Sequence, residues 1–368
     1  MKFNRYALSD LATIKYGKNQ KKVLSESGNI PIYGTGGLMG YATTALYDKP
    51  SVLIGRKGTI GKVKYVEHPF WTVDTLFYTI VNTDIVLPKY LYYVMSLIDL
   101  NNYNEGTTIP SLRTETLNRL EFDIPSLVEQ ETILSCLNPI DEKIALNNAI
   151  NNNLEQQAQA VYNKMFSEVN SEPVELSSII DVRDGTHDSP KVQTTGYYLI
   201  TSKHLLSFGV DKASANHISK VDFDKINERS LVETKDILMS MIGTIGLISY
   251  IPYEAIDFAI KNVALFKTSH TPELAYYFLC YLKSEKTLQH IEKCLAGSTQ
   301  KYISLGELRK MPIYTPTTDE IREFNCLVKP MFEEIVSRTY ENTLLAEMRD
   351  TLLPKLMSGE LDVSDIDL

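Results

Sequence analysis

The sequence predicts an α+β fold with two mixed α/β globular halves and two long helices that pair with each other. Two observations lead to this prediction. The chain of 368 residues repeats itself at an offset of about 190 residues, and each copy ends in a long amphipathic segment. At about 100 to 200 residues per domain, the length alone predicts two or three domains.

The repeat is visible in three short segments that recur in the same order, at offsets of 185, 184 and 191 residues. Each match alone is weak, but three matches in one order with little drift indicate a duplicated unit. The matched segments are Leu53–Val63 with Leu238–Ile248, Pro88–Met95 with Pro272–Leu279, and Gly106–Thr108 with Gly297–Thr299.

Each copy ends in a heptad seam, in which positions spaced alternately by four and three residues are mainly apolar. The first seam runs from Ile133 to Met165, and adding 191 to every position gives a second seam from Phe324 to Leu356. One such stripe would indicate only the core-facing side of a helix, but two matched stripes predict that the helices pack on each other. The residues expected in this seam are Ile140, Ile144, Asn147, Asn151, Leu154, Met331, Ile335, Asn342 and Leu345.

Polar residues interrupt both seams at matching positions. Asn147 and Asn151 in the first seam correspond to Arg338 and Asn342 in the second. Polar seam residues cost stability but fix register, so these side chains are expected to set how the two helices align.

Pro139 and Pro330 also correspond, and each proline either begins its helix as a first-turn residue or marks a kink. The four expected segments are a globular half at 1–125, a helical segment at 126–171, a globular half at 172–318, and a helical segment with a short tail at 319–368.

Both globular halves contain short alternating stretches broken by glycine, which are typical of short strands and turns. Residues 30–37 are such a stretch, and residues 51–54 and 236–239 are expected to form strands. Residues 90–97 and 274–282 are rich in aromatic side chains and are expected to form helices. No strict β-α-β alternation is visible, so a doubly wound parallel sheet is not supported.

The composition, with 43% hydrophobic and 23% charged residues, is that of a soluble globular protein. The four cysteines are too scattered for a disulfide framework or a zinc cluster, which favours a reducing cytoplasm. The sequence shows no secretory signal and no 18-residue apolar stretch, so neither secretion nor membrane spanning is expected.

The net charge of −9 argues at first sight against DNA binding, because DNA-binding proteins usually carry a basic excess. The charge is unevenly distributed, however. The two helical segments carry −4 and −7, whereas the globular halves carry +3 and −1 and contain local basic clusters. The average therefore does not exclude nucleic acid as a partner of the globular halves.

The sequence contains no convincing catalytic or metal centre. Residues 55–63 resemble a phosphate loop, but Arg56 and Val63 stand where that motif needs glycine and Ser or Thr. His290 and Cys294 are two metal-capable groups on one helical face, and two ligands on a face without a third beside them do not make a metal site.

Several loops place long cations beside amide and hydroxyl groups, which can bind phosphates and base edges. For any single cluster, a solvated surface turn is an equally good interpretation. Recurrence at matched points of both halves favours the binding interpretation. His187 and Asp188 could form an acid/base pair, but a turn that contacts a ligand is favoured because the first half has no equivalent pair.

The order of globular half, helix, globular half and helix resembles the DNA-specificity (S) subunit of type I restriction-modification systems across essentially the whole chain. Specific motifs carry the resemblance. They are Leu352–Glu360 near the C-terminus, Ile54–Lys62 following Tyr33–Gly37, and Ile124–Leu127 with Glu129 and Gln130 just after it.

The resemblance implies two target recognition domains, each reading one half of a bipartite DNA sequence. It implies two conserved spacer helices that pack as an antiparallel coiled coil with a pseudo-twofold repeat and fix the gap between the half-sites. It also implies a cytoplasmic chain with no catalytic activity, metal or cofactor of its own.

The partners implied are double-stranded DNA, two methyltransferase (M) subunits and, in the full complex, restriction (R) subunits, with no membrane. The M subunits would methylate adenine at N6 with S-adenosylmethionine, and the R subunits would be ATP-dependent endonucleases that need Mg²⁺.

The second half departs from the family pattern, because its Gly-Thr-Ile-Gly element lacks the Arg-Lys and Lys flanks of the first. Cationic contacts there are expected from Lys203, Lys261 or Lys301. All residues expected to contact DNA are Lys18, Asn19, Tyr33, Thr35, Arg56, Lys57, Thr59, Lys62, Thr107, Thr108, His187, Lys203, Thr244, Lys261, Asn262, Ser298, Thr299, Lys301 and Tyr302.

Two other functions are compatible with the sequence. One is a specificity subunit that serves a modification-only or phase-variable system, and the other is a repeat scaffold that binds only protein. Base readout depends on loop geometry and DNA shape, so the sequence does not define the target.

Overall fold

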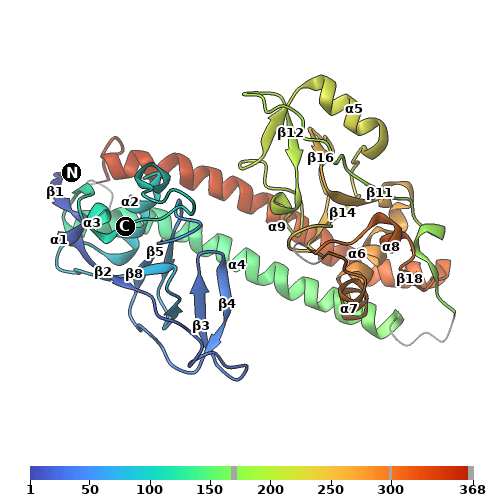
Figure 1. The fold of residues 1–368 in the computed structure, drawn as a ribbon, viewed down its shortest axis with the longest axis horizontal. Helices are drawn as coiled ribbons and strands as arrows, with labels where there is room; N and C mark the ends of the chain where they lie inside the picture. Colours follow the sequence, from blue (N-terminus) through green and yellow to red (C-terminus); the bar gives the residue numbers. More distant parts are fainter. Residues whose placement is uncertain (167–171, 298–300, 364–368) are drawn as a thin grey trace. The chain divides into compact units, whose positions relative to one another are not determined.

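The computed structural model describes residues 1–166, 172–297 and 301–363. Within these ranges the chain is a mixture of short strands, short helices and two long helices, α4 (Leu127–Phe166) and α9 (Thr318–Ser358) (Figure 1). The α+β class predicted from the sequence is confirmed.

The chain divides into two compact units. The first contains Met1–Ile144 and the chain from Leu344 onward, and the second contains Ala145–Thr343. Both long helices therefore contribute to both units, each with one end in the first unit and the other end in the second.

The first unit is built on two sheets. A four-stranded antiparallel sheet has the order β2-β8-β5-β6, and a three-stranded sheet has the order β4-β3-β7, in which β3 and β7 are parallel. A separate pair, β1-β9, closes this half of the chain. The elements are β1 (Asn4–Ala7), α1 (Leu8–Leu11), β2 (Ala12–Tyr16), β3 (Ile30–Gly34), β4 (Gly37–Ala42), β5 (Ser51–Gly55), β6 (Val63–Val66), β7 (Trp71–Thr72), β8 (Leu76–Val81), α2 (Pro88–Ser96), η1 (Leu100–Tyr103), α3 (Thr114–Asn118) and β9 (Glu121–Ile124).

The second unit repeats this topology. Its four-stranded sheet has the order β11-β17-β14-β15, its three-stranded sheet has the order β13-β12-β16 with β12 and β16 parallel, and β10-β18 is the closing pair. The elements are β10 (Val174–Glu175), η2 (Leu176–Ser178), β11 (Val182–Asp184), β12 (Tyr197–Ile200), η3 (Ser202–His204), β13 (Asn216–Ile218), α5 (Lys220–Ser230), β14 (Ile237–Ser240), β15 (Ile248–Tyr250), β16 (Phe258–Ile260), β17 (Val263–Phe266), η4 (Thr268–His270), η5 (Pro272–Leu274), α6 (Ala275–Lys283), α7 (Glu285–Lys293), α8 (Leu305–Arg309) and β18 (Pro312–Ile313).

The matched strand order confirms the internal repeat, and the differences between the halves are insertions. In the second half α5 lies between β13 and β14, where the first half has only the loop of residues 43–50 between β4 and β5. The strands β5 and β14, which lie inside the four-stranded sheets, are completely buried and mainly apolar. Helices α2 and α6 pack against these sheets, as their buried aromatic side chains require.

The two long helices begin with the same capping box. Ser126 Oγ accepts from Glu129 N at 3.3 Å, and the Glu129 carboxylate accepts from Ser126 N at 2.9 Å. Thr317 and Glu320 form the equivalent pair at 3.3 and 2.7 Å. The Thr317 backbone N–H holds the pKa of Glu320 below its usual value. Reciprocal bonds of this kind satisfy N–H groups that the first turn leaves unpaired.

Pro139 and Pro330 lie inside the helices, more than two turns after these caps. Neither proline therefore begins its helix, which excludes one of the two interpretations of the sequence. Each proline leaves the carbonyl four residues earlier without its usual partner.

Helices α4 and α9 pack antiparallel, as the family resemblance implied. In the second unit, Asn147 Nδ2 donates to Asn342 Oδ1 at 2.9 Å, and Arg338 Nη1 donates to Asn147 Oδ1 at 2.9 Å. One turn later in α4, Asn151 Nδ2 lies 3.4 Å from Thr339 Oγ1, which is earlier in α9. The polar positions that interrupt the two seams therefore meet one another.

The core of each unit is completed by one end of α4 and the opposite end of α9. In the first unit Asp141 and Arg349 form an ion pair at 3.2 Å beside this core. The nine residues expected in the seam are all buried or half-buried. The buried core residues that α4 and α9 contribute are Ile133, Leu134, Leu137, Leu353, Leu356 and Met357 in the first core, and Ala158, Tyr162, Phe166, Ile321, Phe324, Val328, Phe332 and Ile335 in the second.

We predict that Asn147→Ala lowers the free energy of unfolding by about 1 to 3 kcal/mol, because it removes the hydrogen bonds that half-buried Asn342 and Arg338 of the partner helix make with Asn147. Asn147 has no exposed surface, whereas Asn152 on the same helix is exposed. The control Asn152→Ala should stay within about 0.5 kcal/mol of the wild type in urea unfolding. Equal effects of the two substitutions would contradict a role for the polar seam.

Candidate nucleic-acid interface

In the first unit, the turn that follows β5 is bonded to the loop of residues 104–112. Gly58 N donates to Pro110 O at 2.8 Å, and Leu112 N donates to Arg56 O at 3.0 Å. Gly58 has a φ of +87°, a left-handed conformation that favours glycine. The residues that these bonds bring to one edge of the unit are Arg56, Lys57, Thr59, Thr107 and Thr108.

The tip of the β3–β4 hairpin lies beside this turn. Thr35 Oγ1 is 3.8 Å from the position that a Cβ atom on Gly58 would occupy. Lys18, in the loop after β2, donates its N–H to Thr72 O at 2.8 Å, and Thr72 is paired with Tyr33 of β3. Several predicted residues from separate parts of the sequence are therefore neighbours.

Tyr33 is buried, with 7% of its surface exposed. Its hydroxyl lies 3.1 Å from His68 Nε2, and Lys64 Nζ lies 3.9 Å from the centre of its ring. Burial raises the pKa of Tyr33, and partial desolvation of the ammonium group lowers the pKa of Lys64, whose side chain is otherwise exposed. The exposed groups at this place are thus Lys64 and His68, which sequence reasoning did not single out.

Arg56 is held in place by its surroundings. Its Nη1 donates to Asp74 O at 2.9 Å, and its guanidinium lies 5.0 Å from the centre of the Tyr16 ring, within the range of a cation–π contact. The other predicted polar side chains near this edge, Asn19, Lys57 and Lys62, are exposed.

The equivalent loops of the second unit are joined in the same way. Ile303 N donates to Met241 O at 3.0 Å, Ile242 forms a β-bridge with Tyr302, and Gly243 has a φ of +81°. Met241 and Ile242 stand where the first unit has Arg56 and Lys57. Of the predicted residues, Thr244, Lys301 and Tyr302 are exposed on these loops, whereas Ser298 and Thr299 lie outside the described residues.

A second polar cluster of this unit gathers at the turn after β11. Thr186 N donates to Ile260 O at 3.0 Å, and Asn262 N donates to Thr186 O at 3.1 Å. His187 Nδ1 lies 2.7 Å from Asn262 Oδ1, and Lys261 is the neighbour of Asn262 in the β16–β17 connection. Three predicted residues, His187, Lys261 and Asn262, therefore lie together. Lys203 is exposed in η3, which follows β12. The last residue of β12, Ile200, accepts a hydrogen bond from Lys261 N at 2.8 Å, so Lys203 lies close to this cluster in the chain.

This turn has a counterpart in the first unit that the sequence comparison missed. Gly17 N donates to Leu76 O at 3.0 Å, and Gly185 N donates to Val263 O at 2.9 Å. A side chain at either glycine would collide with an adjoining backbone carbonyl. The polar residues that follow each glycine are consequently presented by the same backbone arrangement in both halves.

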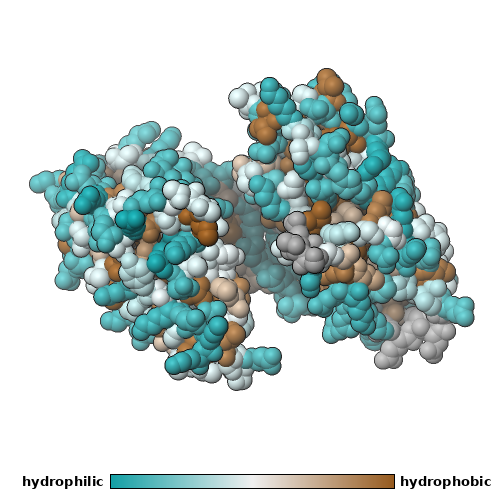
Figure 2. All heavy atoms as spheres, in the orientation of Figure 1, coloured by the Kyte–Doolittle hydropathy of each residue, from teal (hydrophilic) through white to brown (hydrophobic). Residues whose placement is uncertain are grey.

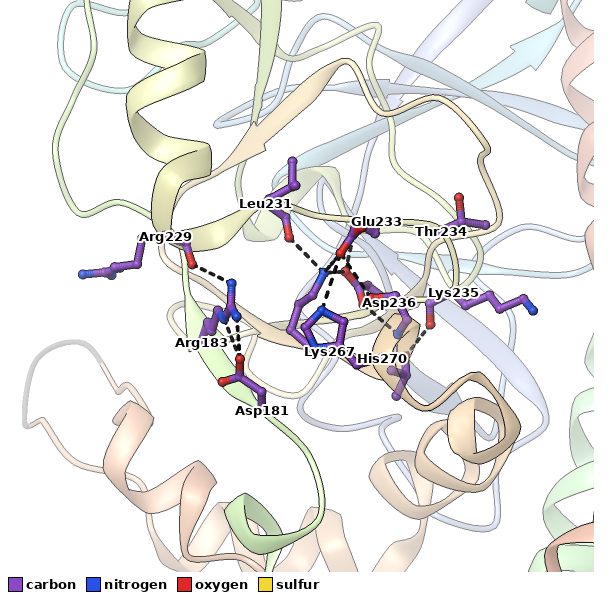
Figure 3. A network of polar contacts seen from close by, with 12 residues as sticks. Asp181, Arg183, Arg229, Leu231, Glu233, Thr234, Lys235, Asp236, Lys267 and His270 are labelled. Atoms are coloured by element: carbon purple, nitrogen blue, oxygen red, sulfur yellow. Dashed lines mark hydrogen bonds and ion pairs between the residues drawn. The ribbon is translucent and has the colours of Figure 1, made fainter.

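Helix α5, which packs against β16, is anchored at its C-terminal end by a buried cation (Figures 1 and 3). Lys267 is 1% exposed, and its Nζ donates to Leu231 O at 3.1 Å, to Glu233 Oε2 at 2.7 Å and to Asp236 Oδ2 at 2.6 Å. Asp236 has no exposed surface, and the hydrogen bond from Lys267 lowers the pKa of Glu233. The network fixes where α5 ends.

Arg229, in the last turn of α5, connects this helix to the Asp184–His187 turn. Its Nη2 donates to Asp184 Oδ1 at 2.5 Å and to the carbonyls of Asp184 and Gly185 at 3.2 Å. The Arg229 carbonyl accepts from Arg183 Nη1 at 3.3 Å, and Figure 3 shows this contact beside the Lys267 network. A comparison of the two repeats could not have identified Arg229, because α5 has no counterpart in the first half.

The molecular face drawn in Figure 2 is mostly hydrophilic, with apolar residues in small groups. Among the described residues, no group of three or more His, Cys, Asp or Glu side chains is placed to hold a metal ion. In the same part of the chain, no helix is long and apolar enough to cross a membrane.

A family model described as the type I restriction modification DNA specificity domain matches residues 2–156 and again residues 168–324. The chain belongs to this family of type I restriction-modification specificity subunits. The first match covers the first globular half and most of α4, and the second covers the second globular half and the start of α9, so the family model recognises each half of the repeat.

Two curated specificity subunits are similar over most of their length. The MjaIX specificity subunit of Methanocaldococcus jannaschii is 25% identical over 353 residues, covering 87% of this chain and 80% of that protein. The HindI specificity subunit of Haemophilus influenzae is 23% identical over 385 residues, covering 82% and 84%. The crystal structure of the S subunit from M. genitalium has a TM-score of 0.52 and 17% identity, covering 97% of this chain and 96% of that one, and supports the fold.

For this specificity subunit, we predict that Arg56→Ala combined with Lys57→Ala weakens DNA binding in an electrophoretic mobility assay at physiological salt. Both residues lie on the turn after β5, and phosphate contacts by such cations supply much of the affinity for DNA. The thermal unfolding temperature should fall only slightly, because Lys57 is exposed and the half-buried Arg56 loses one hydrogen bond to a carbonyl and one cation–π contact. Unaltered affinity would exclude these two residues as DNA contacts.

A second prediction concerns the buried cation. Lys267→Met should lower the free energy of unfolding by about 3 to 5 kcal/mol, because it leaves the buried Asp236 carboxylate without its counter-charge. The control Lys329→Met removes an exposed ion pair with Glu333 and should cost at most about 1 kcal/mol. Urea unfolding of both variants measures the difference, and similar values would contradict the anchoring role of Lys267.

Proposed function

We propose that this specificity subunit reads a bipartite DNA target, with each unit recognising one half. The observation that supports this proposal most directly is that the same arrangement of loops occurs in both units. In both units a glycine-centred turn after equivalent strands, β5 and β14, is hydrogen-bonded to a second polar loop. Cations, amides and hydroxyls on such loops can contact phosphates and base edges.

The two units would recognise DNA with different side chains. The first places Arg56 and Lys57 on the turn after β5, whereas the second has apolar residues there and carries its cations at Lys203, Lys261 and Lys301. Two copies of one fold with different loops would select two different half-sites.

The long helices would fix the gap between the half-sites and dock two methyltransferase subunits. Helix α4 has 40 residues, which corresponds to roughly 60 Å at 1.5 Å per residue. In this proposal the chain itself performs no catalysis. Partner subunits would supply adenine-N6 methylation with S-adenosylmethionine and, in a restricting complex, an endonuclease that needs ATP and Mg²⁺.

Gel mobility of the chain with its methyltransferase partner, on random duplex at several salt concentrations, tests DNA binding. We expect affinity to fall steeply as salt rises, because phosphate contacts release counterions. Absence of salt-dependent DNA binding would instead favour a scaffold that binds only protein.

The role of the helices leads to a further prediction. Inserting four residues, about one turn, into α4 within the seam should lengthen the undefined gap of the target without changing either half-site. As a control, four residues inserted into the loop at 43–50 should leave the gap unchanged. Sequencing of methylated sites measures the gap, and an unchanged gap in the helix variant would refute this role.

A further inference from the structure

The second unit holds one asparagine amide in a fixed position at its surface. Asn262 has a φ of +54°, and its N–H donates to Thr186 O at 3.1 Å, so its backbone is tied to the neighbouring turn. Its side-chain Oδ1 lies 2.7 Å from Nδ1 of His187. His187 is exposed and Asn262 is half-buried, so a ligand can reach this pair.

His187 is held from its other side as well. Its Nε2 lies 3.0 Å from Asp184 Oδ2, and Asp184 is only 8% exposed. The second oxygen of Asp184 accepts from Arg229 Nη2 at 2.5 Å. Both ring nitrogens of His187 are therefore engaged within the protein, and a carboxylate on one of them fixes the orientation of the ring.

We propose that Asn262 reads a base in the half-site of the second unit, and that His187, Asp184 and Arg229 are positioning residues for its amide. This inference rests on the proposed function and names one specificity-determining group within it. It assigns His187 a positioning role, in place of the direct DNA contact expected from the sequence.

The chemistry of the amide explains why such positioning matters. An asparagine side chain has an acceptor at one end and two donors at the other, and base pairs differ in the donors and acceptors that they present in the major groove. His187 Nδ1 engages Oδ1, and no group among the described residues accepts from Asn262 Nδ2. One end of the amide is therefore engaged by His187, and the other end is available to a base edge.

Lys261, which precedes Asn262 in the same turn, suits a different kind of contact with DNA. Its Nζ donates to Ser189 Oγ at 2.5 Å across the turn, beside a hollow of about 480 Å³ between this turn and α5. A lysine is a point charge without the two-ended pattern of an amide, so it suits a phosphate contact, which carries no direct sequence information.

An asparagine can also occupy a left-handed turn for the sake of its backbone alone. Glycine adopts that conformation at least as readily. The substitution Asn262→Gly therefore keeps the turn and removes only the amide, which separates the two roles.

The test uses the full chain with its adenine methyltransferase partner and maps methylated sites for the wild type and three variants. Asn262→Gly should unfold at the wild-type temperature and lose about fivefold or more of the base preference at one position of the target. His187→Phe, which keeps a ring without its nitrogens, should relax the same position to a smaller extent. Lys261→Ala should reduce methylation at all sites alike.

Three outcomes would overturn the inference. They are an Asn262→Gly variant with wild-type preference at every position, an Asn262→Gly variant that folds but methylates no site, and a His187→Phe variant that alters a different position. A wild-type chain that directs no sequence-dependent methylation would overturn the proposed function itself, and this inference with it.

Discussion

The antiparallel packing of α4 on α9 is the interaction on which both units depend. Neither globular half closes its core by itself, because apolar faces from one end of α4 and the opposite end of α9 complete each core. The same helices carry buried asparagines that would be costly to bury without partners. Asn147 is hydrogen-bonded to Asn342 and Arg338, so the antiparallel register gives this buried asparagine its partners.

On this framework the two halves build one fold with different chemistry. In each half a glycine, Gly17 or Gly185, lies against a backbone carbonyl and positions the polar turn that follows it. In each half an arginine also contacts the residue that precedes this glycine. In the first unit Arg56 lies over the Tyr16 ring, and in the second Arg229 forms an ion pair with Asp184. The second pair requires α5, an insertion whose end is held by the buried Lys267. An added helix thus gives the second unit a polar network that has no counterpart among the described residues of the first.

Sequence reasoning predicted the features that depend on regular patterns along the chain. The duplicated motifs and the matched seams predicted two similar units and two paired helices, because a heptad pattern and its interruptions repeat at a constant offset. The capping residues Ser126 and Thr317 follow the same offset.

Features that depend on tertiary packing were not predictable in this way. Tyr33 belongs to a motif and is nevertheless buried, and Arg229 reaches Asp184 only because α5 folds back onto β16. Distribution of charge was more informative than its total, since the helical segments carry −4 and −7 whereas the globular halves carry +3 and −1.

We propose that two copies of one recognition fold read two half-sites at a separation set by the paired helices. Genome-wide mapping of methylated adenines, in a host that carries this chain and its methyltransferase partner, measures the target itself. We expect two short defined sequences separated by an undefined gap of constant length. A single continuous motif, or methylation without sequence preference, would contradict it.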